Sequence, residues 1–289
     1  MLERITGGKR MRENISDFIK NKRLLVCVDS DGCAMDTMEV KHRICFGPMA
    51  VEIWDLNNIE TRFLEIWNNV NLYSKTRGIN RFKGLVRTFE LMETEGIEMP
   101  EFSSILEWTR NSKELSNPAL EMLVDKTGDE QLVKILEWSR AVNKAISKLP
   151  KDDKPFDNVK EGLEIISDVA DVAIVSSANG GAVKEEWTRH ELTPYVQVML
   201  GQEAGTKVAC IAELKRNNYC ADEVLMVGDA PGDLDAAVKN GVLYYPILPG
   251  KEGFSWKRLA SEALSKFVDG SYRHEYQQKL IDEFNSTLK

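Results

Sequence analysis

The stretch from Leu24 to Gly32, which reads LLVCVDSDG, decides the fold that this chain is expected to adopt. Five apolar residues are followed at once by Asp29, Ser30 and Asp31. A short run that is apolar throughout is typical of a strand buried on both faces, as in a parallel sheet covered by helices on either side. The abrupt change to small and acidic residues then marks the carboxyl end of that strand.

Two further segments repeat this pattern later in the chain. The apolar residues 172–175 stop at Ser176, and the apolar residues 224–227 stop at Gly228. Because each run is four residues long and ends in polar, small side chains, we interpret both as buried strands of the same sheet.

Helical patterns separate these strands from about residue 155 onward. The expected helices cover roughly residues 159–168, 181–190, 207–217 and 233–239, and further strands are expected at 195–200 and 243–248. Alternation of strands and helices predicts a doubly wound, Rossmann-like α/β fold with a parallel sheet. Ligands bind such sheets at the carboxyl ends of the strands, so we expect the three polar strand ends to meet in one crevice.

Residues 38–152 have a different character. They carry long helical patterns, at 48–70, 79–96 and 129–149 for example, and no convincing strand. The polar, proline-flanked residues 149–155 are typical of a linker. We therefore expect a discontinuous α/β core made of residues 1–37 and 153–289, interrupted by an all-helical domain of residues 38–152.

The composition excludes several classes of protein. Of the 289 residues, 43% are hydrophobic and 29% are charged, which is typical of a globular protein. The net charge of −8 argues against a nucleic-acid-binding surface, and the lack of any run of about 18 apolar residues argues against a membrane partner. Five cysteines without a CxxC pair, and an amino end without a signal peptide's apolar core, predict free thiols in the cytoplasm. The sequence leaves the oligomeric state open.

Asp29 and Asp31 form a compact acidic pair at the end of the first predicted strand. Asp and Gly are common turn formers, so this pair alone is compatible with an ordinary turn. The same two carboxylates are also suited to nucleophilic and acid–base chemistry. The residues at the other two strand ends favour the second interpretation.

Those strand ends carry groups that suit phosphate and metal binding. Ser176 and Ser177 precede a small-residue turn and a helix, where a hydroxyl and backbone N–H groups would hold a phosphate, although serine is also an ordinary N-cap. Asp229 follows its strand directly, and Asp233 lies four residues later. Carboxylate oxygens of this kind are ligands that Mg²⁺ prefers.

Lys207 begins a predicted helix, where its positive charge opposes the helix dipole. It is either a solvated surface lysine or a cation that faces an anion bound in the crevice. A carboxylate that attacks a phosphate dianion meets charge repulsion, which a lysine and Mg²⁺ would offset. The chain holds a nucleophile, an acid–base group, a hydroxyl donor, a lysine and metal-binding carboxylates at the expected strand ends.

At this point the chain resembles the haloacid dehalogenase superfamily. Residues 29–37, which read DSDGCAMDT, look like the first motif of that superfamily, DxDGxxxDT. Ser176 matches its second motif, Lys207 matches the third, and Asp229 with Asp233 matches the fourth, GDxxxD. The helical insertion lies where the superfamily places a helical cap domain.

The resemblance implies a role for each aspartate. Asp29 would be the nucleophile that forms an aspartyl-phosphate, and Asp31 would be the general acid and base. Mg²⁺ would be held by Asp29, by the backbone carbonyl of Asp31 and by Asp229, and Asp233 would support the water ligands of the metal.

The resemblance also implies which residues hold the phosphoryl group. These would be Ser176, the backbone near Ser177, and Lys207. One residue departs from the superfamily pattern, because Cys33 stands where a threonine is most common and so removes a hydroxyl near the site.

The function expected from the sequence is that of a magnesium-dependent phosphatase, a phosphoric monoester hydrolase that acts on a small phosphorylated metabolite. The resemblance also argues against a dehalogenase, because by the superfamily pattern dehalogenases lack the aspartate at the position of Asp31, since a halide leaving group needs no proton. Three alternatives remain. One is a phosphonatase, for which Lys75 or Lys83 would form a Schiff base. The others are a phosphomutase and a non-catalytic binding protein. The basic stretch 75–83 is either a solvated face or a selector of anionic substrates.

Overall fold

The computed structural model describes residues 15–289 and divides the chain into two compact units. The α/β unit contains Met1–Thr37, of which residues 15–37 are described, and Asp153–Thr287. The helical unit contains Met38–Asp152 together with Leu288–Lys289. The expectation that the amino end is no signal peptide concerns residues outside the described part of the chain.

The α/β unit is built on a five-stranded sheet with the order β3-β2-β1-β4-β5, in which all neighbouring strands are parallel. The strands are β1 (Leu24–Val28), β2 (Ala170–Val175), β3 (Val198–Leu200), β4 (Val224–Gly228) and β5 (Leu243–Pro246). Every residue of β1 is buried, because β1 is central and both of its faces are covered. The predicted doubly wound α/β fold is confirmed.

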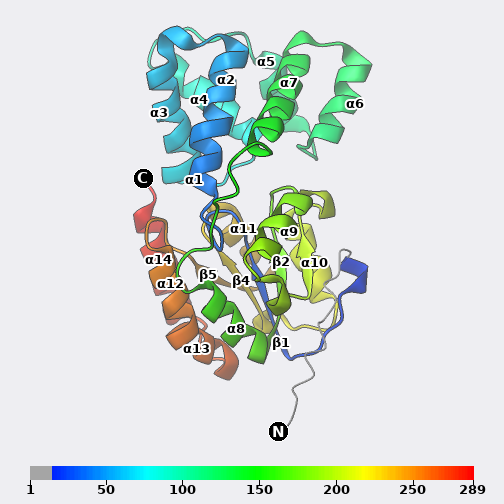
Figure 1. The fold of residues 1–289 in the computed structure, drawn as a ribbon, viewed down its shortest axis with the longest axis vertical. Helices are drawn as coiled ribbons and strands as arrows, with labels where there is room; N and C mark the ends of the chain where they lie inside the picture. The colour runs from blue at the N-terminus through cyan, green and yellow to red at the C-terminus, as the bar shows by residue number, and fades with distance from the viewer. Residues whose placement is uncertain (1–14) are drawn as a thin grey trace. The chain divides into compact units, whose positions relative to one another are not determined.

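Helices cover this sheet on both faces (Figure 1). The helices of the α/β unit are α8 (Val159–Val169), α9 (Gly180–Arg189), α10 (Lys207–Lys215), α11 (Pro231–Asn240), α12 (Glu252–Arg258), α13 (Leu264–Asp269) and α14 (Glu275–Thr287). The side chains of Val26 and Ile174 pack with α8, α9, α12 and α13 in one hydrophobic core. Helix α10 contacts β2, whereas α11 contacts β4 and β5. None of the described helices has the length and apolar character that crossing a membrane requires.

The helical unit contains seven α-helices within the described residues. They are α1 (Met38–Val40), α2 (Gly47–Trp54), α3 (Glu60–Asn68), α4 (Arg81–Thr94), α5 (Ser103–Asn111), α6 (Asn117–Thr127) and α7 (Glu130–Ile146), with π-helical segments at Lys41–Phe46 and Asn69–Tyr73. The helical pattern expected over 48–70 is interrupted after α2. Asp55 adopts the left-handed conformation (φ 54°), which aspartate tolerates better than most residues, and the chain turns there before α3.

The core of the helical unit is aromatic. Trp54, Trp67, Trp108 and Trp138 are all buried. Trp138 makes edge-to-face contacts with Trp54 and Trp67, whose ring centroids lie 6.2 Å and 6.0 Å away. Trp54, Trp67 and Trp138 therefore pack against one another, whereas Trp108 packs against Phe82.

Two linker segments of the α/β unit pair with each other. The backbone N–H of Asp36 donates to the carbonyl of Lys154 (2.9 Å), and the N–H of Phe156 donates to the carbonyl of Ala34 (3.0 Å). The residues between them form an antiparallel bridge. The two points at which the inserted sequence leaves and re-enters this unit are thus hydrogen-bonded neighbours.

A buried aspartate near the amino end of β2 accepts hydrogen bonds from several distant segments. Asp171, on β2, is 1% exposed and accepts hydrogen bonds from the backbone N–H groups of Asn21 and Lys22 (both 2.8 Å). It also accepts from the hydroxyl of Tyr219 (2.6 Å) and from the amide of Gln197. One carboxylate therefore satisfies donors from four separate positions, all of which would be left poorly paired without it.

We expect Asp171→Asn to lower the free energy of unfolding by about 1–3 kcal/mol, because an amide places its own N–H donors against these groups. Urea denaturation followed by circular dichroism measures the change. Asp168→Asn, at an exposed position three residues earlier, is the matched control and should shift the midpoint little. Equal losses in the two variants would contradict a special role for Asp171.

Candidate active site

Asp29 lies directly after the central strand, where the sheet positions it firmly. Its backbone N–H donates to the carbonyl of Val227 on the neighbouring strand β4 (3.0 Å). The residue is 6% exposed, and the N–H of Ser30 donates to its Oδ1 (2.8 Å). The predicted nucleophile is therefore a buried carboxylate at the carboxyl end of β1.

Lys207 reaches this carboxylate from the first turn of α10. Its Nζ lies 2.8 Å from Oδ2 of Asp29 and 2.5 Å from Oδ1 of Asp233. Burial alone would lower the pKa of Lys207, but the attraction of Asp233 and Asp29 outweighs burial and raises the pKa above its usual value. The ammonium group is therefore a permanent positive charge inside the site, and not a solvated surface cation.

Asp229 and Asp233 complete the acidic cluster. Ligand atoms of Asp29, Asp229 and Asp233 lie within 4.8 Å of one another, and all three residues are buried. Asp233 also closes the turn before α11, because its Oδ2 accepts the N–H of Ala230 (3.1 Å). Three carboxylates in so small a space are a set of oxygen ligands suited to a divalent cation.

The cluster has an excess of negative charge. Burial raises the pKa of Asp29 well above its usual value; Lys207 opposes the rise, and the nearby Asp233 and Asp229 add to it. A carboxylate must be ionised to attack an electrophile, and burial together with the neighbouring carboxylates opposes that ionised form of Asp29, whereas Lys207 favours it. A bound divalent cation would supply the missing positive charge, and the donor set fits one.

The loop after Asp29 holds Asp31 in place. The carbonyl of Ser30 accepts the N–H groups of Cys33, Ala34 and Met35, which winds the chain into a tight turn. Gly32 has a φ of 80°, a conformation that glycine adopts without strain. The Oδ1 of Asp31 accepts a hydrogen bond from the hydroxyl of Thr37 (2.7 Å), the last residue of the motif.

The loop also depends on two distant tryptophans, which sequence reasoning missed. The indole N–H of Trp187, on α9, donates to the hydroxyl of Ser30 (2.9 Å), and that of Trp256, on α12, donates to the carbonyl of Cys33 (2.8 Å). Both tryptophans are fully buried. No local signal could have identified them, because they lie more than 150 residues away from the loop in sequence.

Cys33, the departure from the superfamily pattern, is also fully buried. Its Sγ lies 3.6 Å from the carbonyl of Val227, and burial raises the pKa of its thiol well above the usual value. The side chain therefore packs under the loop as a small neutral group.

Ser176 directly follows β2, which is the neighbour of β1 in the sheet. It is 3% exposed, and its backbone N–H donates to the carbonyl of Leu200 (2.8 Å). Its Oγ accepts the N–H of Ala178 (3.1 Å), so its own hydroxyl proton can point elsewhere. The side chain of Ser177 is exposed and is not part of the buried cluster.

The first turn of α9 is not an open cradle of N–H groups, contrary to the simple expectation for this helix start. The carboxylate of Glu203 accepts the N–H of Gly180 (3.0 Å) and the side-chain amide of Asn179 (2.5 Å). Asn179 in turn caps the helix by accepting the N–H of Ala182 (3.1 Å). A carboxylate of the protein therefore already occupies this anion-binding position.

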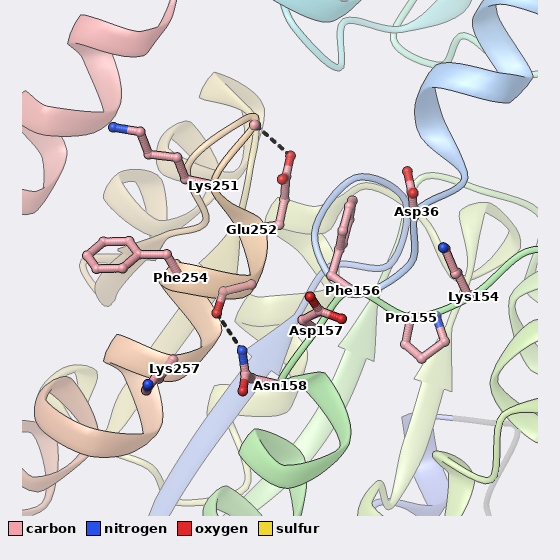
Figure 2. A pocket seen from close by; sticks show the side chains of 12 residues that line it. Asp36, Lys154, Pro155, Phe156, Asp157, Asn158, Lys251, Glu252, Phe254 and Lys257 are labelled. Carbon is pink, nitrogen blue, oxygen red and sulfur yellow. Dashed lines mark hydrogen bonds between the residues drawn. The ribbon is translucent and has the colours of Figure 1, made fainter.

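A separate cleft of about 600 Å³ lies on the α/β unit (Figure 2). It is lined by Asp36, Lys154, Pro155, Phe156, Asp157, Asn158, Gly250, Lys251, Glu252, Gly253, Phe254 and Lys257. Its three lysines and three acidic residues carry equal and opposite formal charge. Figure 2 shows the ring of Phe254 pointing away from Phe156. The cleft contains none of the buried cluster residues, so the candidate active site is the cluster at the strand ends.

This fold and site define a Rossmann-like α/β protein with a lysine and three aspartates at the carboxyl ends of its central strands. The model of the haloacid dehalogenase-like hydrolase family matches residues 99–245, just over half of the chain. The chain therefore belongs to the haloacid dehalogenase-like hydrolase family, as the sequence motifs indicated. A comparison with curated proteins found no match.

A solved structure shows the same fold at low sequence identity, and a second one is more distantly similar. A protein from Lactobacillus delbrueckii subsp. bulgaricus, proposed to be a phosphoglycolate phosphatase, aligns with a TM-score of 0.51 and 13% identity over 86% of this chain and 98% of its own. A protein from Thermotoga maritima, proposed to be a β-phosphoglucomutase, aligns with a TM-score of 0.44 and 16% identity over the same shares. At such identities the likeness concerns the fold alone.

Gly228 has no room for a side chain. A Cβ at this position would lie within 2.5 Å of three side-chain atoms of Asp233, whereas a Cβ at Gly232 would meet nothing within 4 Å. The close packing of Asp233 against the end of β4 therefore requires glycine at 228 but not at 232.

We expect Gly228→Ala to lower the free energy of unfolding by about 1–3 kcal/mol, because Asp233 must move out of its buried position. Gly232→Ala, in the first turn of α11, should be neutral or stabilise by up to about 1 kcal/mol. Chemical denaturation of both variants compares them directly. A neutral Gly228→Ala would show that Asp233 tolerates displacement.

Proposed function

We propose that this protein is a magnesium-dependent phosphatase, a phosphoric monoester hydrolase that cleaves a small phosphorylated metabolite through an aspartyl-phosphate on Asp29. The observation that carries the proposal is the buried lysine ammonium among three buried carboxylates, with Asp29 at the end of the central strand. Membership of a hydrolase family supports it. The five free cysteines are in keeping with a reducing compartment, so we propose a cytoplasmic location.

In the first proposed step, an oxygen of Asp29 attacks the phosphorus atom and the bond to the ester oxygen breaks. Asp31 gives its proton to that leaving oxygen, so that the alcohol departs neutral. The hydrogen bond from Thr37 would keep the carboxyl group of Asp31 oriented for this transfer.

In the second step, Asp31 accepts a proton from water while the water oxygen attacks the phosphorus atom. The bond between phosphorus and Asp29 breaks, which releases inorganic phosphate and restores the carboxylate. Two successive displacements replace one difficult attack of water on the ester.

Three groups are proposed to hold the phosphoryl group. The hydroxyl of Ser176 can donate to it, because its oxygen already accepts the N–H of Ala178. The backbone near Ser177 would add a second donor, and Lys207 would offset the charge of the phosphoryl oxygens.

Mg²⁺ is proposed to bind to Asp29, to the backbone carbonyl of Asp31 and to Asp229, with Asp233 supporting its water ligands. When bound, the ion would neutralise charge on the phosphate and favour the ionised form of Asp29. The excess negative charge of the cluster supports this assignment.

We also propose that residues 38–152 act as the cap domain of this hydrolase, which would exclude bulk water and bulky substrates. The phosphonatase alternative would need a desolvated lysine in that domain. Its two candidates, Lys75 and Lys83, are both exposed. Neither of these two lysines therefore supports a phosphonatase.

The first test is release of phosphate from a panel of sugar phosphates, phosphorylated acids, nucleotides, phosphonates and an aryl phosphate, with and without Mg²⁺. We expect Mg²⁺-dependent release from esters and none from phosphonates.

Asp29→Asn should lower kcat by about 10³-fold or more, because an amide does not attack phosphorus. Its circular dichroism spectrum should match the wild type, and retained turnover in this variant would refute the covalent mechanism.

A second test separates the two steps. With an aryl phosphate the leaving phenolate needs no proton, so Asp31→Asn should still allow attack by Asp29 but should stall the attack of water. We expect a rapid burst of about one equivalent of phenolate per site, followed by slow turnover. Stopped-flow absorbance measures the burst, and slow release without a burst would contradict the proposed division of roles.

A further inference from the structure

The four cations of the stretch 75–83 differ sharply in their surroundings. Lys75 and Lys83 are exposed to solvent. Arg77 is 5% exposed and donates from Nη1 to the carbonyl of Leu72 (2.7 Å), so part of its guanidinium bonds to the backbone. Arg81 is partly buried and contacts only side chains.

Arg81 is held in one orientation by several elements of the helical unit. It is the first residue of α4, and its Nη1 donates to Oδ1 of Asn143 (2.7 Å) and to Oγ of Ser139 (3.3 Å), both on α7. Its guanidinium lies 4.9 Å from the ring centre of Phe46. Ser139 is itself fixed by donating to Oδ1 of Asn117 (2.7 Å). The side chain is thus preorganised.

Unlike most other arginines of the helical unit, Arg81 has no carboxylate of residues 15–289 paired with it. Five other arginines of the helical unit each form an ion pair with a glutamate, although all five are exposed: Arg43, Arg62, Arg87, Arg110 and Arg140. The partners of Arg81 are neutral, and burial lowers its pKa to about 10. A partly buried cation without a counter-charge is unfavourable until an anion binds to it.

The free edge of the guanidinium has the geometry for such an anion. Both hydrogen bonds of Arg81 use Nη1, and no residue in the described part of the chain accepts from Nε or Nη2. The Nε–Nη2 edge presents two parallel N–H groups, the fork that matches the two oxygens of a carboxylate or a phosphate.

We propose that Arg81 forms an oxyanion-binding site in the helical unit, which takes the carboxylate or phosphate group of a small molecule. Asn143 and Ser139 fix the guanidinium, Phe46 supports its face, and the Nε–Nη2 edge binds the anion. The anion comes either from a second acidic group of the ester that the proposed phosphatase cleaves or from a separate small-molecule effector. The site itself does not depend on the proposed function.

Binding tests the site without catalysis. Isothermal titration calorimetry at constant ionic strength would use malonate and inorganic phosphate as probes. Arg81→Gln should weaken binding of at least one probe by about tenfold or more, because it removes the charge and the fork. Arg87→Gln, an exposed arginine on the same helix, is the matched control and should change affinity less than about twofold.

Arg81→Lys provides a second variant that keeps the positive charge but not the fork. We expect an affinity between those of the wild type and Arg81→Gln. Circular dichroism and the unfolding midpoint check that each variant is folded. Unchanged affinity for both probes in folded Arg81→Gln, or failure of the wild type to bind either probe, would overturn the proposal.

Kinetics then identify the source of the anion. For an ester with a second acidic group, such as 2-phosphoglycolate, Arg81→Gln should raise KM about tenfold or more with little change in kcat, and KM for ethyl phosphate should not change. Loss of probe binding with unaltered KM for both esters assigns the site to a separate effector. If the wild type cleaves no ester, the proposed function fails while the calorimetry still decides the site.

Discussion

The ion pairs of Lys207 with Asp29 and Asp233 are the interaction on which the rest of the α/β unit depends. They join the end of β1, the start of α10 and the start of α11, three segments that are far apart in sequence. Each charge is buried, so loss of any partner would leave another uncompensated, at a cost of about 3–5 kcal/mol. Two neighbouring features help to keep these groups close. Gly228 gives Asp233 its space, and Ser30 accepts the hydrogen bonds that wind the adjoining loop.

The strands and the buried cluster could be predicted from the sequence because their signals are local. An apolar run that ends in acidic residues identifies both a strand and its carboxyl end, and parallel pairing then brings the ends of β1, β2 and β4 together. Asp29, Lys207 and Asp229 were expected at one edge of the sheet for this reason, and in the structure they lie close together. It could not locate Trp187 or Glu203, because their contacts arise only when distant helices and loops pack.

Less of the helical unit could be predicted, because burial and not residue type distinguishes the members of a charged stretch. Arg77 and Arg81 are four residues apart and chemically identical, yet one donates to a backbone carbonyl and the other to side chains of α7. Likewise, the helical pattern over 48–70 concealed the turn at Asp55, where a left-handed residue ends α2. Such details depend on the whole unit being assembled.

The paired linkers have an evolutionary consequence. Since the segments around Asp36 and Lys154 are joined by backbone hydrogen bonds, the inserted sequence closes a loop whose ends are already adjacent. The entropy of closing a loop grows only slowly with its length, so an insertion of almost any size at this point disturbs the sheet little. The pairing uses backbone groups and therefore places few demands on side chains. Recombination at these two positions could exchange one inserted domain for another and leave the chemistry of the strand ends intact.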